Sequence, residues 1–276
     1  MRNHEARGPA FYALTAFFVL FVLFLYGPLS TIVILSFQGP NGGLTFPMNG
    51  VSLHWFGNLF QKQAVGDFAG SFMRSIILGL MVMIVTVVVS LLAGLAFRRR
   101  FHGSAALFYL AVASLIVPSI LVSLGIGLLF RIAGIMPAWY SSAFGAQLTW
   151  TLPFGLLIMF AVFNRFNRSY EEAARDLGAT PWQTFSNVVL PLVLPSLIGV
   201  GLFGFTLSYD EFARTLMTAG TYNTLPLEIY GMTTNVTTPV LYALGTLTTA
   251  FSFLIIIVSL VAILVLRRRR ARLTAV

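Results

Sequence analysis

Six long apolar stretches alternate with short polar links along the chain. They cover about residues 11–37, 75–97, 105–130, 148–163, 188–208 and 245–266. A helix that rises 1.5 Å per residue needs about 20 apolar residues to cross the roughly 30 Å hydrocarbon core of a bilayer. The pattern therefore predicts an all-α, polytopic membrane protein with about six transmembrane helices. The fourth stretch is the shortest and is interrupted by Pro153.

The composition supports lipid as the main solvent of the protein. Of the 276 residues, 58% are hydrophobic and only 9% are charged, whereas soluble domains carry about 25% charged residues. Cysteine is absent, which excludes disulfides and thiolate chemistry. The three histidines, His4, His54 and His102, are widely scattered, so we expect no metal site.

Arginine placement predicts the orientation. Thirteen of the 17 basic residues fall in the N-terminal segment, the second-to-third link, the fourth-to-fifth link and the tail. By the positive-inside rule, these parts and both termini are cytoplasmic. We therefore expect a cytoplasmic segment at residues 1–10, a transmembrane domain at 11–266 and a basic cytoplasmic tail at 267–276. Because the arginines lie beside apolar runs, they indicate contact with the lipid bilayer and not with nucleic acid.

The start of the chain also has features of a secretory signal, because Arg2 and Arg7 precede an apolar run. That run is too long for a signal-peptide core, and no small-residue cleavage pattern follows it. We therefore interpret the first stretch as a helix that is not removed.

The fourth-to-fifth link, residues 169–191, predicts two short helices joined by a sharp turn. Ser169 with Glu172, and Thr180 with Gln183, have the spacing of capping boxes. Gly178 stands where the first helix should end in a left-handed C-cap. The link would form a rigid cytoplasmic bracket between two membrane helices. The alternative is an ordinary amphipathic connector on the membrane surface.

The spacing in this link resembles the EAA motif of permease subunits in type I ATP-binding-cassette (ABC) importers. That pattern is Glu-Ala-Ala, three residues, Gly, nine residues, Ile, one residue and Leu-Pro. The matching positions are Glu172, Ala173, Ala174, Gly178, Leu190 and Pro191, with Val188 in place of the isoleucine. The resemblance implies that residues 169–191, called the coupling loop from here on, dock on a separate cytoplasmic ATPase dimer. ATP-driven closure of that dimer would rotate the membrane helices.

The energy for transport must come from another subunit. A phosphate-binding P-loop needs a Gly-Lys-Ser/Thr run, but the single lysine, Lys62, lies between Gln61 and Gln63. ATP and Mg²⁺ would therefore bind to the partner ATPase, and we expect no cofactor in this chain. We find no nucleophile–base arrangement and assign no catalytic or metal-binding residue.

Acidic residues after the fifth apolar stretch are candidates for the substrate path. Tyr209, Asp210 and Glu211 combine an aromatic ring with two carboxylates, which suits an organic cation. The alternative is that Asp210 pairs with Arg214, four residues on, and only anchors a helix end. The sequence leaves both interpretations open.

Segments that begin at Ser52, Ser208, Thr224 and Thr237 resemble the spermidine/putrescine branch of these permeases. One departure is Val240, where relatives often carry glutamate. The resemblance implies a polyamine substrate, a second homologous permease subunit, a periplasmic binding protein and a place in the bacterial inner membrane. Importers of iron, thiamine, opines and amino-acid derivatives share much of the pattern, so these substrates remain alternatives.

Two rival functions belong to other classes. A secondary transporter would show inverted repeats and ionisable groups at the membrane midplane, but we find no internal repeat and no charge within the six apolar stretches. A non-transporting assembly factor is the second rival, and only the coupling-loop motif argues against it.

Overall fold

The computed structural model describes residues 8–60, 66–99, 101–235 and 238–273. Within these residues the ordered elements are helices and no strand is formed, which confirms the all-α prediction. Lys62 and the arginines at 2, 7 and 100 lie outside the described residues, as do the side chains of the tail arginines. The helices are α1 (Pro9–Leu35), α2 (His54–Asn58), α3 (Phe68–Phe97), α4 (Ser104–Ala113), α5 (Ser119–Ile132), the π-turn η1 (Trp139–Ala143), α6 (Phe144–Asn164), α7 (Ser169–Asp176), α8 (Pro181–Thr184), the π-turn η2 (Phe185–Val189), α9 (Leu190–Tyr209), α10 (Leu225–Asn235) and α11 (Val240–Leu273).

The chain forms two compact units. The first comprises Met1–Gly66 with Met232–Phe253, and the second Asp67–Gly231 with Leu254–Val276. In the first unit, most large apolar side chains of α1 are exposed, as expected for a helix whose surroundings are lipid or other subunits. The loop after α1 is organised by the buried Gln38, which donates to the carbonyl of Gly43 and accepts from the amide of Asn49.

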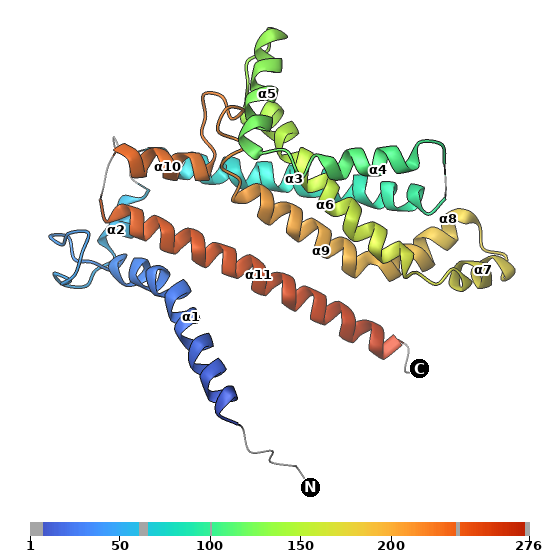
Figure 1. Ribbon diagram of the computed structural model, residues 1–276, viewed down its shortest axis with the longest axis horizontal. Coiled ribbons are helices and arrows are strands. Elements are labelled where there is room, and N and C mark those ends of the chain that lie inside the picture. The colour runs from blue at the N-terminus through green and yellow to red at the C-terminus, as the bar shows by residue number, and fades with distance from the viewer. Residues whose placement is uncertain (1–7, 61–65, 100, 236–237, 274–276) are drawn as a thin grey trace. The chain divides into compact units, whose positions relative to one another are not determined.

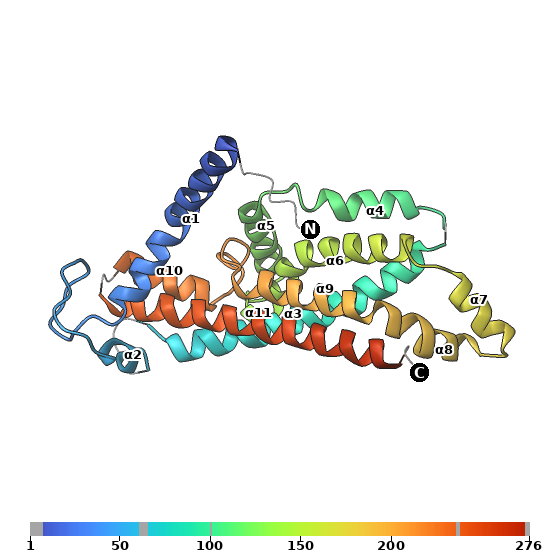
Figure 2. The same cartoon turned by 90° about the horizontal axis from the view of Figure 1, so that it is seen from below.

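The second unit is built on α3, α6 and α9, which pack against one another and run side by side (Figures 1 and 2). Their contact faces carry small residues, which let membrane helices approach closely. A Cβ added to Gly155 of α6, for example, would clash with the Ser90 side chain of α3. Two buried polar links join the helices. Thr86 donates to Thr151 at 3.0 Å, and Ser208 donates to the Gln147 amide oxygen.

The third apolar stretch is not one helix, so the prediction of a single span at 105–130 is wrong. It divides into α4 and α5, and α5 turns sharply away from the direction of α4 (Figure 1). The break ends at Pro118, the N-cap of α5, which has an extended ψ of 130°. Proline lacks an amide proton and disfavours helix at the residue before it. The Ser114 hydroxyl lies 2.7 Å from the carbonyl oxygens of Ala111 and Thr149, which stabilises the end of α4.

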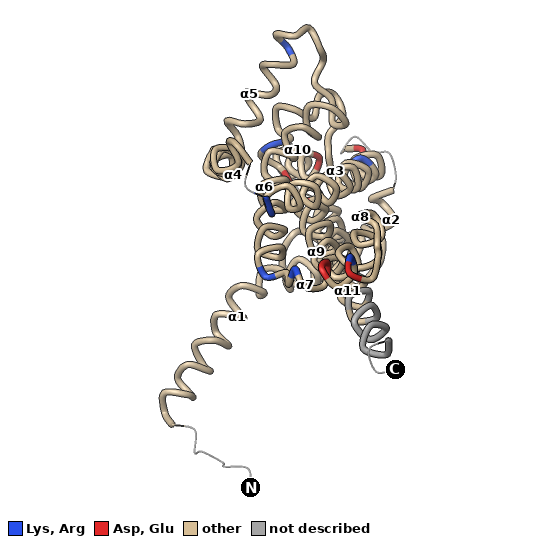
Figure 3. Tube along the Cα trace, turned by 90° about the vertical axis from the view of Figure 1, so that its right-hand side faces the viewer, with Lys and Arg blue, Asp and Glu red and all other residues tan. Residues whose placement is uncertain are grey.

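Five helices of the described residues are long and apolar enough to cross a membrane: Pro9–Leu35, Phe68–Phe97, Trp139–Asn164, Pro181–Tyr209 and Val240–Val258. The fourth predicted stretch is longer than expected, because η1 and α6 continue each other and Pro153 is accommodated as a buried residue of α6. Charged positions are few along the traced helices (Figure 3).

Candidate functional site

The coupling loop forms a helix, a sharp turn and a second helix, as its sequence predicts. Gly178 has a φ of +84°, in the left-handed region. Its amide donates to the carbonyl of Arg175 at 2.8 Å, and the amide of Ala179 donates to the carbonyl of Ala174 at 3.0 Å. These two bonds make a Schellman C-cap. Thr180 and Gln183 form the predicted capping box at the start of α8.

The first predicted capping box is wrong. The N-cap of α7 is Arg168, which makes no side-chain capping bond, and Ser169 is already the first helical residue. The Asn167 side-chain oxygen accepts from the Ser169 amide at 3.0 Å. The asparagine two residues upstream thus accepts from the Ser169 amide, for which the predicted box had assigned the Glu172 side chain as acceptor.

The motif residues are divided between the two arms of the loop. Glu172, Ala173 and Ala174 lie on α7, Gly178 makes the turn, and Leu190 and Pro191 begin α9. Glu172, Ala173 and Gly178 are exposed. The turn also presents apolar surface, because Leu177 is 89% exposed and Trp182 is 70% exposed. Exposed apolar side chains at the tip of a polar loop are typical of a surface that contacts another protein.

An ion pair that the sequence analysis missed ties α7 to the end of α3. Arg98, the C-cap of α3, lies 2.6 Å from Glu171, and both side chains are largely buried. The guanidinium also lies over the rings of Phe163 and Phe166, at 5.3 and 5.2 Å. Arg168 donates to the Arg98 carbonyl at 3.0 Å. Two features of the sequence could have indicated this ion pair, because Arg98 directly follows an apolar span and Glu171 lies in the first turn of α7.

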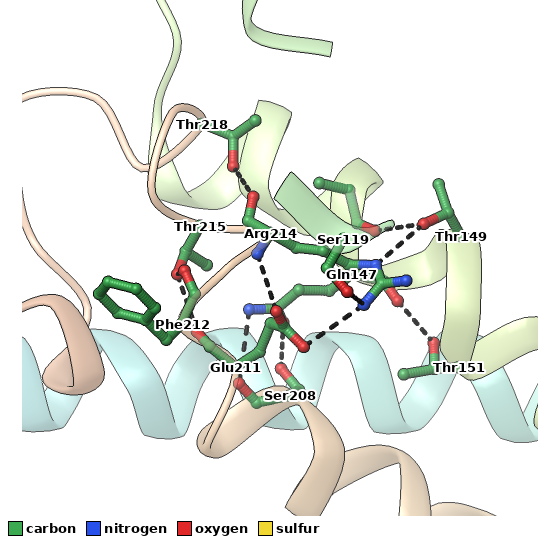
Figure 4. Close-up of polar contacts among 11 residues, drawn as sticks. Ser119, Gln147, Thr149, Thr151, Ser208, Glu211, Phe212, Arg214, Thr215 and Thr218 are labelled. Carbon is green, nitrogen blue, oxygen red and sulfur yellow. Dashed lines mark hydrogen bonds and ion pairs between the residues drawn. The ribbon is translucent and has the colours of Figure 1, made fainter. Parts of the chain in front are cut away.

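A second polar site, the Arg214 cluster, lies beyond the other end of α9. It consists of Glu211, Arg214, Ser119, Thr149 and Trp150 (Figure 4 shows all but Trp150). The Arg214 guanidinium is 3.6 Å from Glu211, donates to Ser119 at 2.7 Å and to Thr149 at 3.4 Å, and lies 4.5 Å from the Trp150 ring centre. Glu211 also accepts from the Arg214 amide at 2.8 Å. The cluster therefore joins α5, α6 and the segment after α9.

Burial makes this ion pair energetically important. The side chains of Arg214 and Glu211 are only 3% and 7% exposed. Desolvation lowers the pKa of Arg214, whereas the charge of Glu211 and its hydrogen bond act in the opposite direction. The carboxylate thus compensates a cation that would otherwise be buried without a counter-ion.

The three predicted substrate-path residues have different surroundings. Glu211 is committed to Arg214, and Tyr209 is buried, with its ring stacked on Phe205 at 5.9 Å. Asp210 is exposed. The predicted alternative, in which Asp210 pairs with Arg214, is wrong, because the partner of Arg214 is Glu211. Partial desolvation by the surrounding protein raises the pKa of Asp210.

The other acids at this end of the second unit have partners. Asp67 is 3.4 Å from Arg74, and the Glu228 carboxylate accepts from the Asp67 amide at 2.8 Å and from the Asn223 side chain at 2.9 Å. Of the four acids here that the structure describes, Asp210 is thus the one whose carboxylate makes no described hydrogen bond or ion pair.

Comparison with known proteins agrees with this geometry. Residues 86–273 match the family described as binding-protein-dependent transport system inner membrane component. The spermidine/putrescine transport system permease protein PotC of Haemophilus influenzae is 28% identical over 251 residues, covering 90% of this chain and 95% of the relative. The putrescine transport system permease protein PotI of Escherichia coli K12 is 28% identical over 232 residues, covering 81% of each.

Solved structures show the same fold. A chain of a bacterial ABC transporter involved in alginate import has a TM-score of 0.68 at 15% identity, with 93% of this chain and 94% of that chain covered. A chain of the MetNI methionine ABC transporter has a TM-score of 0.57 at 17% identity, with 72% and 94% covered.

These likenesses confirm the predicted permease architecture, the multi-pass location in the bacterial inner membrane and a role in transport that is not enzymatic. Because the matched family consists of components of binding-protein-dependent transport systems, the two rival functions, a secondary transporter and an assembly factor, are excluded. The family match covers most of the chain and agrees with its apolar helices and bent loop. The chain therefore belongs to the family of binding-protein-dependent transport system inner membrane components.

Proposed function

We propose that this permease couples to a cytoplasmic ATPase dimer through the coupling loop. ATP and Mg²⁺ bind to that ATPase, a second homologous permease completes the membrane pathway, and a periplasmic binding protein delivers the substrate. The observation that carries the proposal is the geometry of the loop. A left-handed turn at Gly178 presents the exposed Leu177 and Trp182, while Arg98 and Glu171 fasten the same loop to α3.

The helices after the turn offer a direct route for motion. α8, η2 and α9 follow one another without a break from Pro181 to Tyr209, a rod of 29 residues or roughly 43 Å at helical rise. A displacement at Pro181 therefore tilts the end that carries Asp210. The ion pair of Arg98 with Glu171 passes the same displacement to α3. ATP shifts the population between inward- and outward-open states only if the ATPase contacts the loop differently in the two.

A polyamine is the substrate that we favour. The two permeases described above, from Haemophilus influenzae and Escherichia coli, are named for spermidine and putrescine transport. A polyamine carries ammonium groups, and the exposed Asp210 carboxylate offers a counter-charge that the described residues leave uncommitted. Charged hydrogen bonds of this kind are among the stronger polar contacts.

We expect Asp210→Asn to raise the KM for spermidine uptake about tenfold to a hundredfold, because the lost charge-assisted contact contributes roughly 1.5–3 kcal/mol. The measurement is uptake by the complete transporter in proteoliposomes with its ATPase and binding protein. Asp67→Asn is the matched control, since Asp67 is an exposed acid at the same end that already pairs with Arg74. Equal KM values for Asp210→Asn and wild type would show that Asp210 does not bind the substrate. Uptake of iron, thiamine, an opine or an amino-acid derivative in place of polyamines would reassign the substrate.

A further inference from the structure

A cavity of about 400 Å³ lies between the end of α3, α7 and the start of the α8–α9 rod. Its apolar lining comes from Leu95, Pro181, Phe185 and Val189. Its polar lining comes from Thr184, four arginines at 98, 99, 168 and 175, and two glutamates at 171 and 172. The cavity therefore combines an apolar wall with a guanidinium-rich rim.

The rim has an excess of positive charge. Glu171 is committed to Arg98, and Arg168 uses one of its donors on the Arg98 carbonyl. Among the described ion pairs, none involves Arg99, Arg168 or Arg175, and all three side chains are exposed. Four arginines against two glutamates leave the lining with a net charge of +2. A cation would be repelled here, and an anion would be attracted.

The position of the cavity indicates which anion it meets. Arg98 directly follows the last residue of α3, so the cavity opens where an apolar span of 30 residues ends. At that depth the hydrocarbon core gives way to lipid headgroups. The cytoplasmic leaflet carries anionic lipids, and basic pockets between membrane helices on that side bind their headgroups. An apolar wall beside guanidinium groups matches an amphiphile better than a small inorganic ion.

We propose that this cavity binds the phosphate of an anionic phospholipid, with the adjoining glycerol and acyl carbons against the apolar wall. The proposal rests on the cytoplasmic placement of the coupling loop. A lipid held here bridges the C-terminal end of α3 and α7, the same two elements that Arg98 and Glu171 connect. It stabilises the position of the coupling loop, and transport then depends on the anionic lipid content of the leaflet.

The test is native mass spectrometry of the detergent-purified complete transporter, titrated with phosphatidylglycerol, phosphatidylcholine or inorganic phosphate. Arg99→Gln/Arg175→Gln removes two rim charges and leaves the bonds of Arg98 and Arg168 intact. Arg131→Gln/Arg165→Gln is the matched control, because both of these arginines are exposed and lie outside the cavity lining. At a contribution of about 1 kcal/mol per basic residue, the rim variant should bind phosphatidylglycerol about thirtyfold more weakly, and the control should bind like wild type.

Three results would overturn the lipid site. The first is equal phosphatidylglycerol affinity in both double variants, and the second is phosphatidylcholine binding as tight as phosphatidylglycerol binding. The third is displacement of the lipid by inorganic phosphate, which would assign the site to a free anion. The same spectra report whether the ATPase remains bound. Loss of lipid selectivity with the ATPase present contradicts this inference alone, whereas absence of the ATPase from the wild-type complex contradicts the proposed function.

Discussion

Gly178→Leu is expected to reduce uptake about tenfold to a hundredfold while the protein still reaches the membrane. Gly178 adopts a φ of +84°, which costs a residue with a Cβ about 1–2 kcal/mol. No neighbour lies within 4 Å of an added Cβ, so the effect comes from the backbone and not from a clash. The turn relaxes, the angle between α7 and α8 changes, and Leu177 and Trp182 lose their placement. Coupling energies between distant sites are typically 1–3 kcal/mol, which sets the size of the loss.

The chain offers a matched control for this variant. Gly103 has a φ of +82°, also has no neighbour within 4 Å of an added Cβ, and lies outside the coupling loop at the N-cap of α4. Gly103→Leu introduces the same strain and should leave most of the uptake intact. Gly178→Asn should retain activity as well, because asparagine tolerates the left-handed region. The coupling role of the turn is contradicted if Gly178→Leu and Gly103→Leu transport equally well at equal membrane levels.

Glu211→Gln should destabilise the folded protein by about 3 kcal/mol or more. The substitution preserves shape but leaves the buried Arg214 guanidinium without its counter-ion, and an uncompensated buried charge typically costs 3–5 kcal/mol. The midpoint of thermal unfolding in detergent micelles, measured together with the surviving membrane-inserted fraction, reports the loss. Because Arg214 joins α5, α6 and the segment after α9, we expect α5 to become accessible to protease first.

Two comparisons identify the cause of this loss. Asp67→Asn also neutralises one partner of an ion pair, but the Asp67 side chain is 55% exposed, so the cost should stay below about 1 kcal/mol. Adding Arg214→Met to Glu211→Gln removes the second charge and should recover part of the stability. A double variant that is less stable than Glu211→Gln would show that the bonds of Arg214 to Ser119 and Thr149 matter more than the ion pair.

Local signals in the sequence predicted the turn and the second capping box of the coupling loop, but not the start of α7. The turn at Gly178 and the capping box of Thr180 and Gln183 depend on residues within a few positions of one another, and both are formed. Hydropathy identified the long spans because their apolar character does not depend on their neighbours. It failed at 105–130, where hydropathy is continuous but Pro118 interrupts the backbone hydrogen bonding. A pattern of apolar residues does not distinguish one helix from two that meet at a proline.

Contacts between distant segments were harder to predict. Arg98 and Glu171 are 73 residues apart, and their pairing depends on how α3 and α7 end beside each other. Two acids precede Arg214 at distances that allow an ion pair in a helix, Asp210 four residues before it and Glu211 three residues before it. The sequence analysis chose Asp210, because residues four apart lie on the same face of a helix. The helix ends at Tyr209, however, so this spacing does not decide which acid pairs with Arg214 in the segment that follows. Likewise, the partners of Asp67, Glu211 and Glu228, which leave Asp210 as the acid without a described partner, are visible only in the structure.

The most direct test of the coupling loop uses the absence of cysteine from the chain. Leu177→Cys places a single thiol at a side chain that is 89% exposed at the turn. The thiol is coupled to a short photo-activated cross-linker in the assembled transporter, and the product is identified by mass spectrometry. A cross-link to the ATPase subunit is the expected result. Cross-links to lipid or to a periplasmic protein, with none to the ATPase, would contradict the assignment of residues 169–191 as the coupling element.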